Sequence, residues 1–306
     1  MKRTCKLFCL LLATLLLASC TPNTNTAEGE YTFTDSTGHT VTLSQAPTRV
    51  AVLLSSFAEI WQLAGGEIAV TVGESVERGF CASGITLVDE GAGKSINTEV
   101  LIASAPDLVI LSADIPAQLE AAALCRAAGI PVAEMRVECF AEYLAMLKIC
   151  TDLTGRADLY EQYGTAQAAQ IDALIANKPL DGSKILFVRA GTSARSVKPK
   201  SSADHFAAAM LAQLGATNIA DGTALLADGL SMEYILQEDP DHIYFTAMGD
   251  EQSSRAFVEQ MLQEPEWQAL TAVQNGSYTF LPKENFHYKP NAAWAKSYAL
   301  LCGGGA

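Results

Sequence analysis

Short apolar runs alternate along this chain with longer segments in which apolar residues recur at helical spacing. Six of these runs are bounded by turn or helix-start residues and predict strands, at 50–54, 68–72, 108–111, 185–188, 243–245 and 278–281. The intervening segments 57–63, 115–128 and 203–214 have the periodicity of helices. Such alternation is typical of mostly parallel sheets that helices cover on both faces. The sequence therefore predicts the α/β fold class.

An internal repeat divides the chain into two halves. Residues 99–113 and 233–247 match at a constant offset of 134, with four identities and the same apolar positions. Each copy follows a residue suited to an N-cap, Asn97 or Ser231, and runs from a short predicted helix through a Pro-Asp turn into a strand. The repeat predicts two similar lobes.

The segment 157–178 lies between the two halves and predicts one long helix, which Pro179 ends. It follows a separate predicted helix at about 140–153. At a rise of about 1.5 Å per residue it would be roughly 33 Å long, enough to connect an N-terminal lobe at 31–154 with a C-terminal lobe at 183–306. A helix packed wholly on one lobe is the alternative. A helical connector is stiff, so we expect the lobes to close only slightly.

The first 30 residues have a different character from the rest. A basic start is followed by twelve apolar residues, which are too few for a membrane span of about 20 residues and typical of a signal peptide. The letters Leu-Ala-Ser-Cys at 17–20 resemble a bacterial lipobox, which predicts a signal peptide at 1–19, lipidation of Cys20 and a polar tether at 20–30. The protein would then be anchored by lipid to the extracytoplasmic face of the cell membrane. An ordinary secretory signal that ends near a chance cysteine is the alternative.

Composition and charge exclude several classes of function. Of the 306 residues, 49% are hydrophobic and only 18% are charged, which indicates packed lobes and not a disordered chain. Without Lys2, Arg3 and Lys6, 17 basic residues remain against 34 acidic ones, a net charge of −17. A protein this acidic should bind neither nucleic acid nor, apart from its lipid anchor, an anionic membrane.

The cysteines leave their pairing open. Without the signal peptide and Cys20, five cysteines remain, and an odd number leaves at least one unpaired or in an intermolecular bond. Buried apolar cysteines are the preferred interpretation for this set, which consists of Cys81, Cys125, Cys139, Cys150 and Cys302.

No catalytic or metal-binding motif is complete. GxSxG, HExxH, CxxC and EF-hand patterns are absent, and the four histidines are too far apart for a local metal motif. The segment 88–95 (VDEGAGKS) approaches a phosphate-binding loop, but Val88 replaces its first glycine, and Asp89 and Glu90 would repel phosphate. We therefore predict neither an enzyme nor a resident metal or cofactor. An exported enzyme on a similar scaffold is the alternative.

Candidate ligand-binding residues follow the predicted strands. Arg189 ends the strand at 185–188, inside a segment, 182–203, that has five basic residues and no acidic one and also includes Arg195 and Lys198. Parallel sheets bind ligands at the carboxyl edge, and arginine offers bidentate donors to carboxylate, catecholate or phosphate oxygens. A solvated basic loop is the alternative.

Further candidates follow other strands of the predicted sheets. An aromatic and titratable cluster after the last strand suits a flat or apolar ligand, although Phe286 could equally belong to the core. Ser55 and Ser56 could instead be helix N-caps. The full set consists of Ser55, Ser56, Arg78 and Phe80 in the N-terminal half and Phe286, His287 and Tyr288 in the C-terminal half.

Several features together resemble one protein family. They are the lipobox, the opening FTDSTGHTVTL at 33–43, the Glu-x6-Pro-Asp unit in each half and WQALTAVQNG at 267–276. In their order and spacing, over about residues 31–301, they resemble the ABC-importer substrate-binding proteins for iron–siderophore complexes, haem and cobalamin. The resemblance implies two Rossmann-like lobes with mostly parallel sheets, joined by a single long helix, that bind a metal chelate between them.

The resemblance also implies partners and a mechanism. Glu99 and Glu233 match the residues that dock onto the two permease subunits of an importer driven by its ATPase, although each could simply favour its helix dipole. The protein is expected to act as a monomer. A lipid-anchored surface protein that presents a binding face to a sensor or partner, without transport, is the alternative.

The resemblance does not single out one ligand, so the candidates are compared through individual residues. The ring-stacking tryptophans of cobalamin-binding members align with Gly93 and Ala227, which makes cobalamin a weaker candidate. The basic segment favours an anionic ferric siderophore, and His287 or Tyr288 could be an axial ligand to haem iron.

Overall fold

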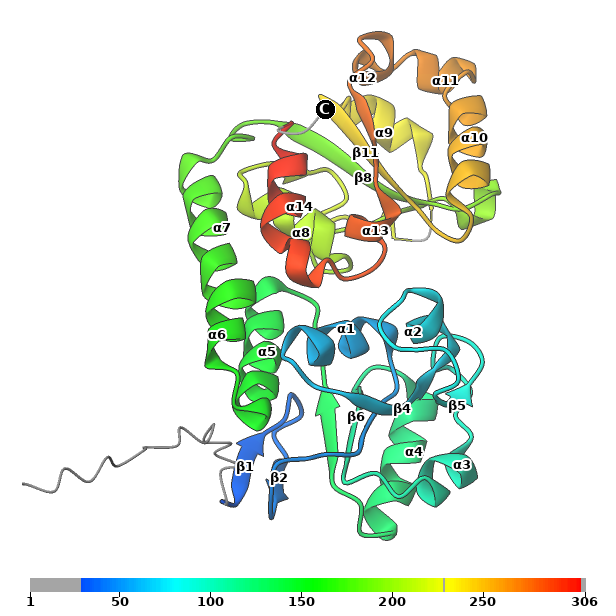
Figure 1. Ribbon diagram of the computed structural model, residues 1–306. Coiled ribbons are helices and arrows are strands. Elements are labelled where there is room, and N and C mark those ends of the chain that lie inside the picture. The colour runs from blue at the N-terminus through cyan, green and yellow to red at the C-terminus, as the bar shows by residue number, and fades with distance from the viewer. Residues whose placement is uncertain (1–28, 228, 304–306) are drawn as a thin grey trace, which may run out of the picture.

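The computed structural model describes residues 29–227 and 229–303. It has two α/β lobes, one above the other in Figure 1, with a long helical segment along one side of both. The predicted fold class is confirmed.

The predicted signal peptide, Cys20 and most of the predicted tether lie outside the described residues. None of the described helices combines the length and the apolar character that a membrane span requires.

The N-terminal lobe is built on a five-stranded parallel sheet with the order β5-β4-β3-β6-β7. Its strands are β3 (Val50–Val52), β4 (Ile68–Val72), β5 (Thr86–Asp89), β6 (Leu108–Ser112) and β7 (Val132–Met135). The helices that follow the first four are α1 (Ser55–Leu63), α2 (Gly73–Glu77), α3 (Thr98–Ala103) and α4 (Pro116–Ala127). The strand order reverses at β3, which opens a crevice at the carboxyl edge of the sheet.

The C-terminal lobe repeats this plan. Its parallel strands have the order β10-β8-β11-β12, and β9 pairs with β8 in antiparallel fashion. The strands are β8 (Lys184–Ala190), β9 (Lys198–Pro199), β10 (Thr217–Asn218), β11 (His242–Ala247) and β12 (Tyr278–Leu281). Its helices are α8 (Phe206–Gln213), α9 (Met232–Glu238), α10 (Glu251–Met261), α11 (Pro265–Gln268), α12 (Thr271–Gln274), α13 (Lys283–Phe286) and α14 (Trp294–Leu301), with 3-10 turns at Ala194–Ser196 and Asn291–Ala293.

The Pro-Asp turns make the same contacts in both lobes. The Asp107 carboxylate accepts a hydrogen bond from the Arg49 amide at 2.9 Å, and its own amide donates to the Arg49 carbonyl. Asp241 forms the same pair of bonds with Lys184. Each aspartate therefore ties the start of one central strand to the start of its neighbour, which is why the repeat preserves it.

The residues that flank the two repeat helices have similar backbone conformations at the C-terminal end but different cap contacts at the N-terminal end. Ala105 and Asp239, which precede the two prolines, both have a left-handed backbone, with φ of 45° and 40°. Asn97 accepts the expected cap hydrogen bond from the Val100 amide. Ser231 occupies the N-cap position of α9, as predicted, but its side chain forms no cap hydrogen bond among the described residues.

The connector is continuous but not uniform. After α5 (Phe140–Thr154), it runs through α6 (Ala157–Tyr160), a π-helical turn (Glu161–Thr165) and α7 (Ala166–Asn177). Its first part packs on α5 of the N-terminal lobe and α7 packs on α14 of the C-terminal lobe, so the alternative of a helix on one lobe is excluded. In the π-helical turn, the Tyr163 carbonyl accepts hydrogen bonds from the Tyr143 hydroxyl and from Gln167.

Packing also joins the two lobes directly. The fully buried Trp294 of α14 lies 6.0 Å from Phe140 and 6.4 Å from Tyr143 in the N-terminal lobe, and 5.7 Å from Phe206 in its own lobe, between ring centres. One hydrophobic cluster consequently extends through both lobes. A large rotation of the lobes would have to break it.

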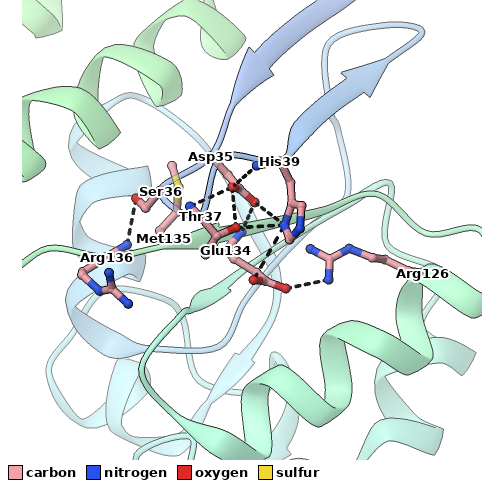
Figure 2. Close-up of polar contacts among 8 residues, drawn as sticks. All are labelled: Asp35, Ser36, Thr37, His39, Arg126, Glu134, Met135 and Arg136. Atoms are coloured by element: carbon pink, nitrogen blue, oxygen red, sulfur yellow. Dashed lines mark hydrogen bonds and ion pairs between the residues drawn. The ribbon is translucent and has the colours of Figure 1, made fainter.

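The hairpin β1–β2 (Tyr31–Thr34, Thr40–Leu43) covers the exposed edge of β7. In Figure 2, the Ser36 amide donates to the Glu134 carbonyl at 3.1 Å, and the Glu134 amide donates to the Asp35 carboxylate at 3.1 Å. The Arg136 amide donates to the Ser36 hydroxyl at 3.0 Å. The turn at 35–39 thus satisfies the polar groups of an edge strand that would otherwise be open to pairing with another chain.

Candidate functional site

A cavity of about 320 Å³ lies between the two lobes. Residues at or after the carboxyl ends of all five N-terminal strands line it, and a loop after β12 closes it from the C-terminal lobe. Open α/β sheets bind ligands at this edge. The lining residues are Leu54, Ser55, Ser56, Phe57, Glu74, Ala92, Lys94, Ser112, Asp114, Ile115, Val137, Glu138, His287, Tyr288 and Lys289.

Arg78 lies beside this cavity, between aromatic rings from both lobes. Its guanidinium carbon is 4.6 Å from the ring centre of Phe80 and 4.1 Å from that of Tyr288. The same guanidinium donates to the Ser55 hydroxyl at 3.0 Å and reaches the Ser56 hydroxyl at 3.4 Å. These five predicted residues therefore lie together, although they come from three separate segments of the chain.

A partly buried carboxylate accompanies this arginine. Glu59 lies 3.7 Å from Arg78, and its carboxylate accepts a hydrogen bond from the Asn291 amide group at 2.7 Å. Burial raises the pKa of Glu59, and these two partners only partly offset that effect. Burial also lowers the pKa of Arg78, against the attraction of Glu59 and Glu74.

Ser55 and Ser56 are not helix caps. Both are buried in the first turn of α1, but its N-cap is Leu54 and no side chain caps the helix. The Ser55 hydroxyl donates to the Glu74 carboxylate and accepts from Arg78. The alternative that sequence analysis left open for these serines is therefore wrong.

Arg189 lies next to the last residue of β8, at the carboxyl edge. It is partly buried, and its buried Nε has no hydrogen-bond partner among the described residues. Burial lowers the pKa of Arg189. A cationic donor in this position is incompletely satisfied by its own chain.

His287 lies among cations. Burial and the repulsion of Arg189, Lys283, Arg78 and Lys94 lower the pKa of His287 to about 4. The imidazole is therefore neutral at pH 7, which leaves a ring nitrogen able to accept a hydrogen bond or to ligate a metal.

A second neutral histidine, His205, could not be predicted from the sequence. Burial is the main cause that lowers the pKa of His205 to about 3, and nearby cations add to it. Its ring lies 4.8 Å from that of Phe187 and 4.9 Å from that of Phe206, and its Nδ1 caps α8 by accepting from the Ala207 amide. These contacts give His205 a role in packing and capping.

Three other predicted site residues lie apart from the group around Arg78. Phe286 is fully buried in the core, as the alternative for this residue describes. Arg195 is exposed in the turn before β9. Lys198 is partly buried in β9, where it pairs with Arg189 in the antiparallel ladder. Lys184, which belongs to the same basic segment, lies at the opposite end of β8 and forms an ion pair with Glu238 at 3.1 Å.

The predicted docking glutamates occupy equivalent places in the two lobes. Glu99 lies in the first turn of α3 and Glu233 in the first turn of α9, and both are exposed. Within the described part of the chain, neither forms an ion pair at 4.0 Å or less.

In the glycine-rich segment at 88–95, backbone amides bind the carboxylate of Asp89, a residue of the same segment. Asp89 accepts hydrogen bonds from the amides of Gly91, Gly93, Lys94 and Ser95, at 3.0, 2.7, 2.9 and 3.4 Å. Burial alone would raise the pKa of Asp89, but these bonds lower it. The amides that would surround a phosphate are already satisfied, which agrees with the exclusion of a nucleotide site.

Gln118 of α4 is a positioning residue that sequence analysis missed. It is fully buried and donates to the carbonyls of Leu53 and Gly93 at 2.7 and 2.9 Å, while it accepts from the Ser112 amide at 2.7 Å. It thereby fixes three of the strand ends that surround the cavity. A single glutamine in an alanine-rich helix gives no signal of such a role.

The described cysteines are all free thiols. Cys125 and Cys150 are buried, and burial raises the pKa of Cys150 to about 12, so both fit the expected apolar role. Cys81, Cys139 and Cys302 are only partly buried.

Solved structures with this fold include three binding proteins. The catecholate-siderophore binding protein VctP from Vibrio cholerae has a TM-score of 0.71 at 14% identity, over 90% of this chain and 100% of that chain. SirA from Staphylococcus aureus, complexed with staphyloferrin B, has a TM-score of 0.65 at 17% identity, over 89% and 96%. The vitamin B12 binding protein BtuF of Vibrio cholerae has a TM-score of 0.68 at 16% identity, over 85% and 96%.

Sequence comparisons place the chain in a family. A comparison with curated proteins gave no significant match. The family model for periplasmic binding proteins matches residues 41–284, which include both sheets, the connector and most of the residues around the cavity. The chain belongs to the periplasmic binding protein family.

Proposed function

We propose that this protein is the substrate-binding component of an ABC importer and that it captures an anionic ferric chelate between its lobes. The observation that carries the proposal is Arg189, whose partly buried guanidinium has an unpartnered Nε at the carboxyl edge of the C-terminal sheet. The fold, which VctP, SirA and BtuF share, supports a ligand between the lobes.

The charge around the cavity favours an anionic ligand. Within the described part of the chain, no carboxylate lies within 4.0 Å of the side-chain nitrogens of Arg189, Lys94 or Lys283, and all three cations contribute to the low pKa of His287. Arg189 and Lys283 are partly buried, and removing a cation from water is costly unless an anion compensates it. Catecholate or carboxylate oxygens of a ferric chelate would supply that anion through charge-assisted hydrogen bonds.

The cavity wall argues against a ligand held in the manner of cobalamin. A side chain at position 93 would place its Cβ 2.2 Å from the Leu53 carbonyl oxygen and 2.5 Å from Gln118, on a backbone with φ of +78°. The loop therefore has no room for a ring-stacking residue there.

Haem is the second candidate, and His287 favours it. A neutral imidazole that lines the cavity is the form that ligates haem iron. An axial bond would make His287 essential for haem binding, whereas a ferric siderophore would depend chiefly on Arg189 and Arg78.

Delivery completes the proposed function. Glu99 and Glu233 would each contact one permease subunit, and the lipid on Cys20 would raise the effective concentration of the protein beside the permease. The exposure of one unpaired glutamate on each lobe supports this arrangement, which suits a monomer.

A titration with four ligands tests the proposal. Purified protein is mixed with a ferric triscatecholate, ferric citrate, haemin and cyanocobalamin, and tryptophan fluorescence and visible absorption are recorded. We expect saturable binding of at least one anionic ferric chelate, or a shifted Soret band with haemin. Binding of cyanocobalamin alone would overturn the anionic ligand. Binding of none would favour a surface protein that presents a face to a sensor or partner.

A further inference from the structure

Four consecutive residues of the C-terminal lobe cross to the N-terminal lobe. This segment, Tyr288-Lys289-Pro290-Asn291, is here named the interlobe strap. The Tyr288 ring covers Arg78 at 4.1 Å, and the Lys289 ammonium lies 2.6 Å from the Glu138 carboxylate. Asn291 donates to the Ser56 carbonyl at 2.9 Å. All three of its polar side chains therefore contact the opposite lobe.

The inner end of the strap is fixed. Asn291 is fully buried, and Gln167 of the connector donates to its carbonyl at 3.1 Å. Gln167 in turn accepts from the Ala295 amide at 3.1 Å. A ligand in the cavity has no access to these bonds, so Asn291 is a pivot and not a contact that the ligand exchanges.

The outer end is different, because its ion pair lines the cavity. The side chain of Lys289 is only 19% exposed, while that of Glu138 is 59% exposed. Lys289 also lies 4.7 Å from the ring centre of Phe206 in its own lobe. The lysine is thus held in place without Glu138, whereas Glu138 is free to turn into solvent.

We propose that Glu138 is an internal counterion of Lys289 that an anionic ligand displaces when it enters the cleft. The inference rests on the proposed function, because the displacing group is the anionic oxygen of the chelate. Glu138 then acts as a specificity-determining residue. A ligand with an anionic group near Lys289 replaces the lost ion pair, whereas a neutral or cationic chelate does not.

The consequence is unusual for a residue that lines a binding site, since removing it should strengthen binding. In Glu138→Ala, the partly buried Lys289 has lost its counterion before the ligand arrives. Affinity for an anionic ferric chelate should rise roughly two- to fivefold, the range for a partly exposed ion pair. Lys289→Met should weaken the same ligand.

The matched control is Asp152→Ala. Asp152 is 58% exposed and forms an ion pair with Lys148 at the same 2.6 Å distance, on the surface of α5. This variant removes one negative charge, as Glu138→Ala does, so it corrects for the overall charge of the protein.

Two measurements test the proposal. The first is the affinity of the wild type and the variants for ferric citrate, a ferric triscatecholate and a cationic ferric trihydroxamate. The second is hydrogen–deuterium exchange of peptides that cover 283–293 in the ligand-free protein. We expect tighter binding of the anionic chelates only, and faster exchange of the strap, in Glu138→Ala but not in Asp152→Ala.

The outcomes separate this inference from the proposed function. Equal affinities in Glu138→Ala and Asp152→Ala, or weaker binding in Glu138→Ala, would refute displacement. If the wild type binds none of the three chelates, the proposed function fails for them, and unchanged exchange in Glu138→Ala would also refute the counterion contact.

Discussion

Replacing Arg189 with methionine should have opposite effects on ligand affinity and on stability. The methionine side chain extends about as far as the arginine Nε and has no charge, so it fits an environment in which the buried Nε has no partner. In the free protein the substitution removes a cation that burial disfavours, as the lowered pKa of Arg189 shows. In the complex it removes a donor to the anionic ligand.

The magnitudes follow from the burial of the side chain. A charge-assisted hydrogen bond is worth about 1.5–3 kcal/mol, so affinity for an anionic ferric chelate should fall about 10- to 150-fold. Replacing a buried ion pair by apolar residues of similar volume can stabilise a protein by about 1–4 kcal/mol, and for one partly exposed arginine we expect about 1 kcal/mol at most.

Calorimetric titration and urea unfolding measure the two effects. Arg195→Met is the matched control, because this exposed arginine belongs to the same basic segment and its loss should change neither quantity. A destabilised Arg189→Met with unchanged ligand affinity would show that Arg189 serves the fold and would refute its role in the site.

Three further predictions concern other parts of the molecule. The double substitution Glu99→Ala and Glu233→Ala should abolish uptake in cells and leave ligand affinity intact; uptake that survives would refute docking through these residues. Asp35→Ala should lower the free energy of unfolding in urea by about 1–3 kcal/mol, since the buried Glu134 amide loses its acceptor; an unchanged value would contradict the hairpin's role in covering β7. The pKa of His287 is lowered from 6.5 to about 4, so its contribution to stability is intact above pH 6.5 and is lost as the pH falls towards 4. His287→Gln should therefore flatten the pH profile of urea unfolding over that range, and a profile as steep as that of the wild type would refute the neutral imidazole.

Strands made mainly of apolar residues could be predicted from the sequence. The limits of β4 and β12 match the prediction, because turn residues flank both runs. β7 was missed because Glu134 interrupts its apolar pattern. In the fold that carboxylate is buried and pairs with Arg126 at 2.6 Å, a partner eight residues earlier that no periodicity reveals.

The residues of the site likewise divide into those that could be predicted from the sequence and those that could not. Arg189 could be found because it ends a recognisable strand, and the geometry of parallel sheets gives the ends of strands a common edge. Gln118, Glu138 and Asn291 gave no signal, because each is a single polar residue whose partners lie in other segments. Only the folded chain shows that they position or close the site.

The mechanical design of the molecule bears on how it selects a ligand. The core around Trp294 extends through both lobes, and the buried Asn291 is tied to the connector through Gln167. Because these contacts oppose a large rotation of the lobes, discrimination through extensive closure is unavailable. Selection must then come from side chains that can move at the rim of the cleft, and the ion pair of Lys289 with Glu138 is such a contact, because the Glu138 side chain is 59% exposed.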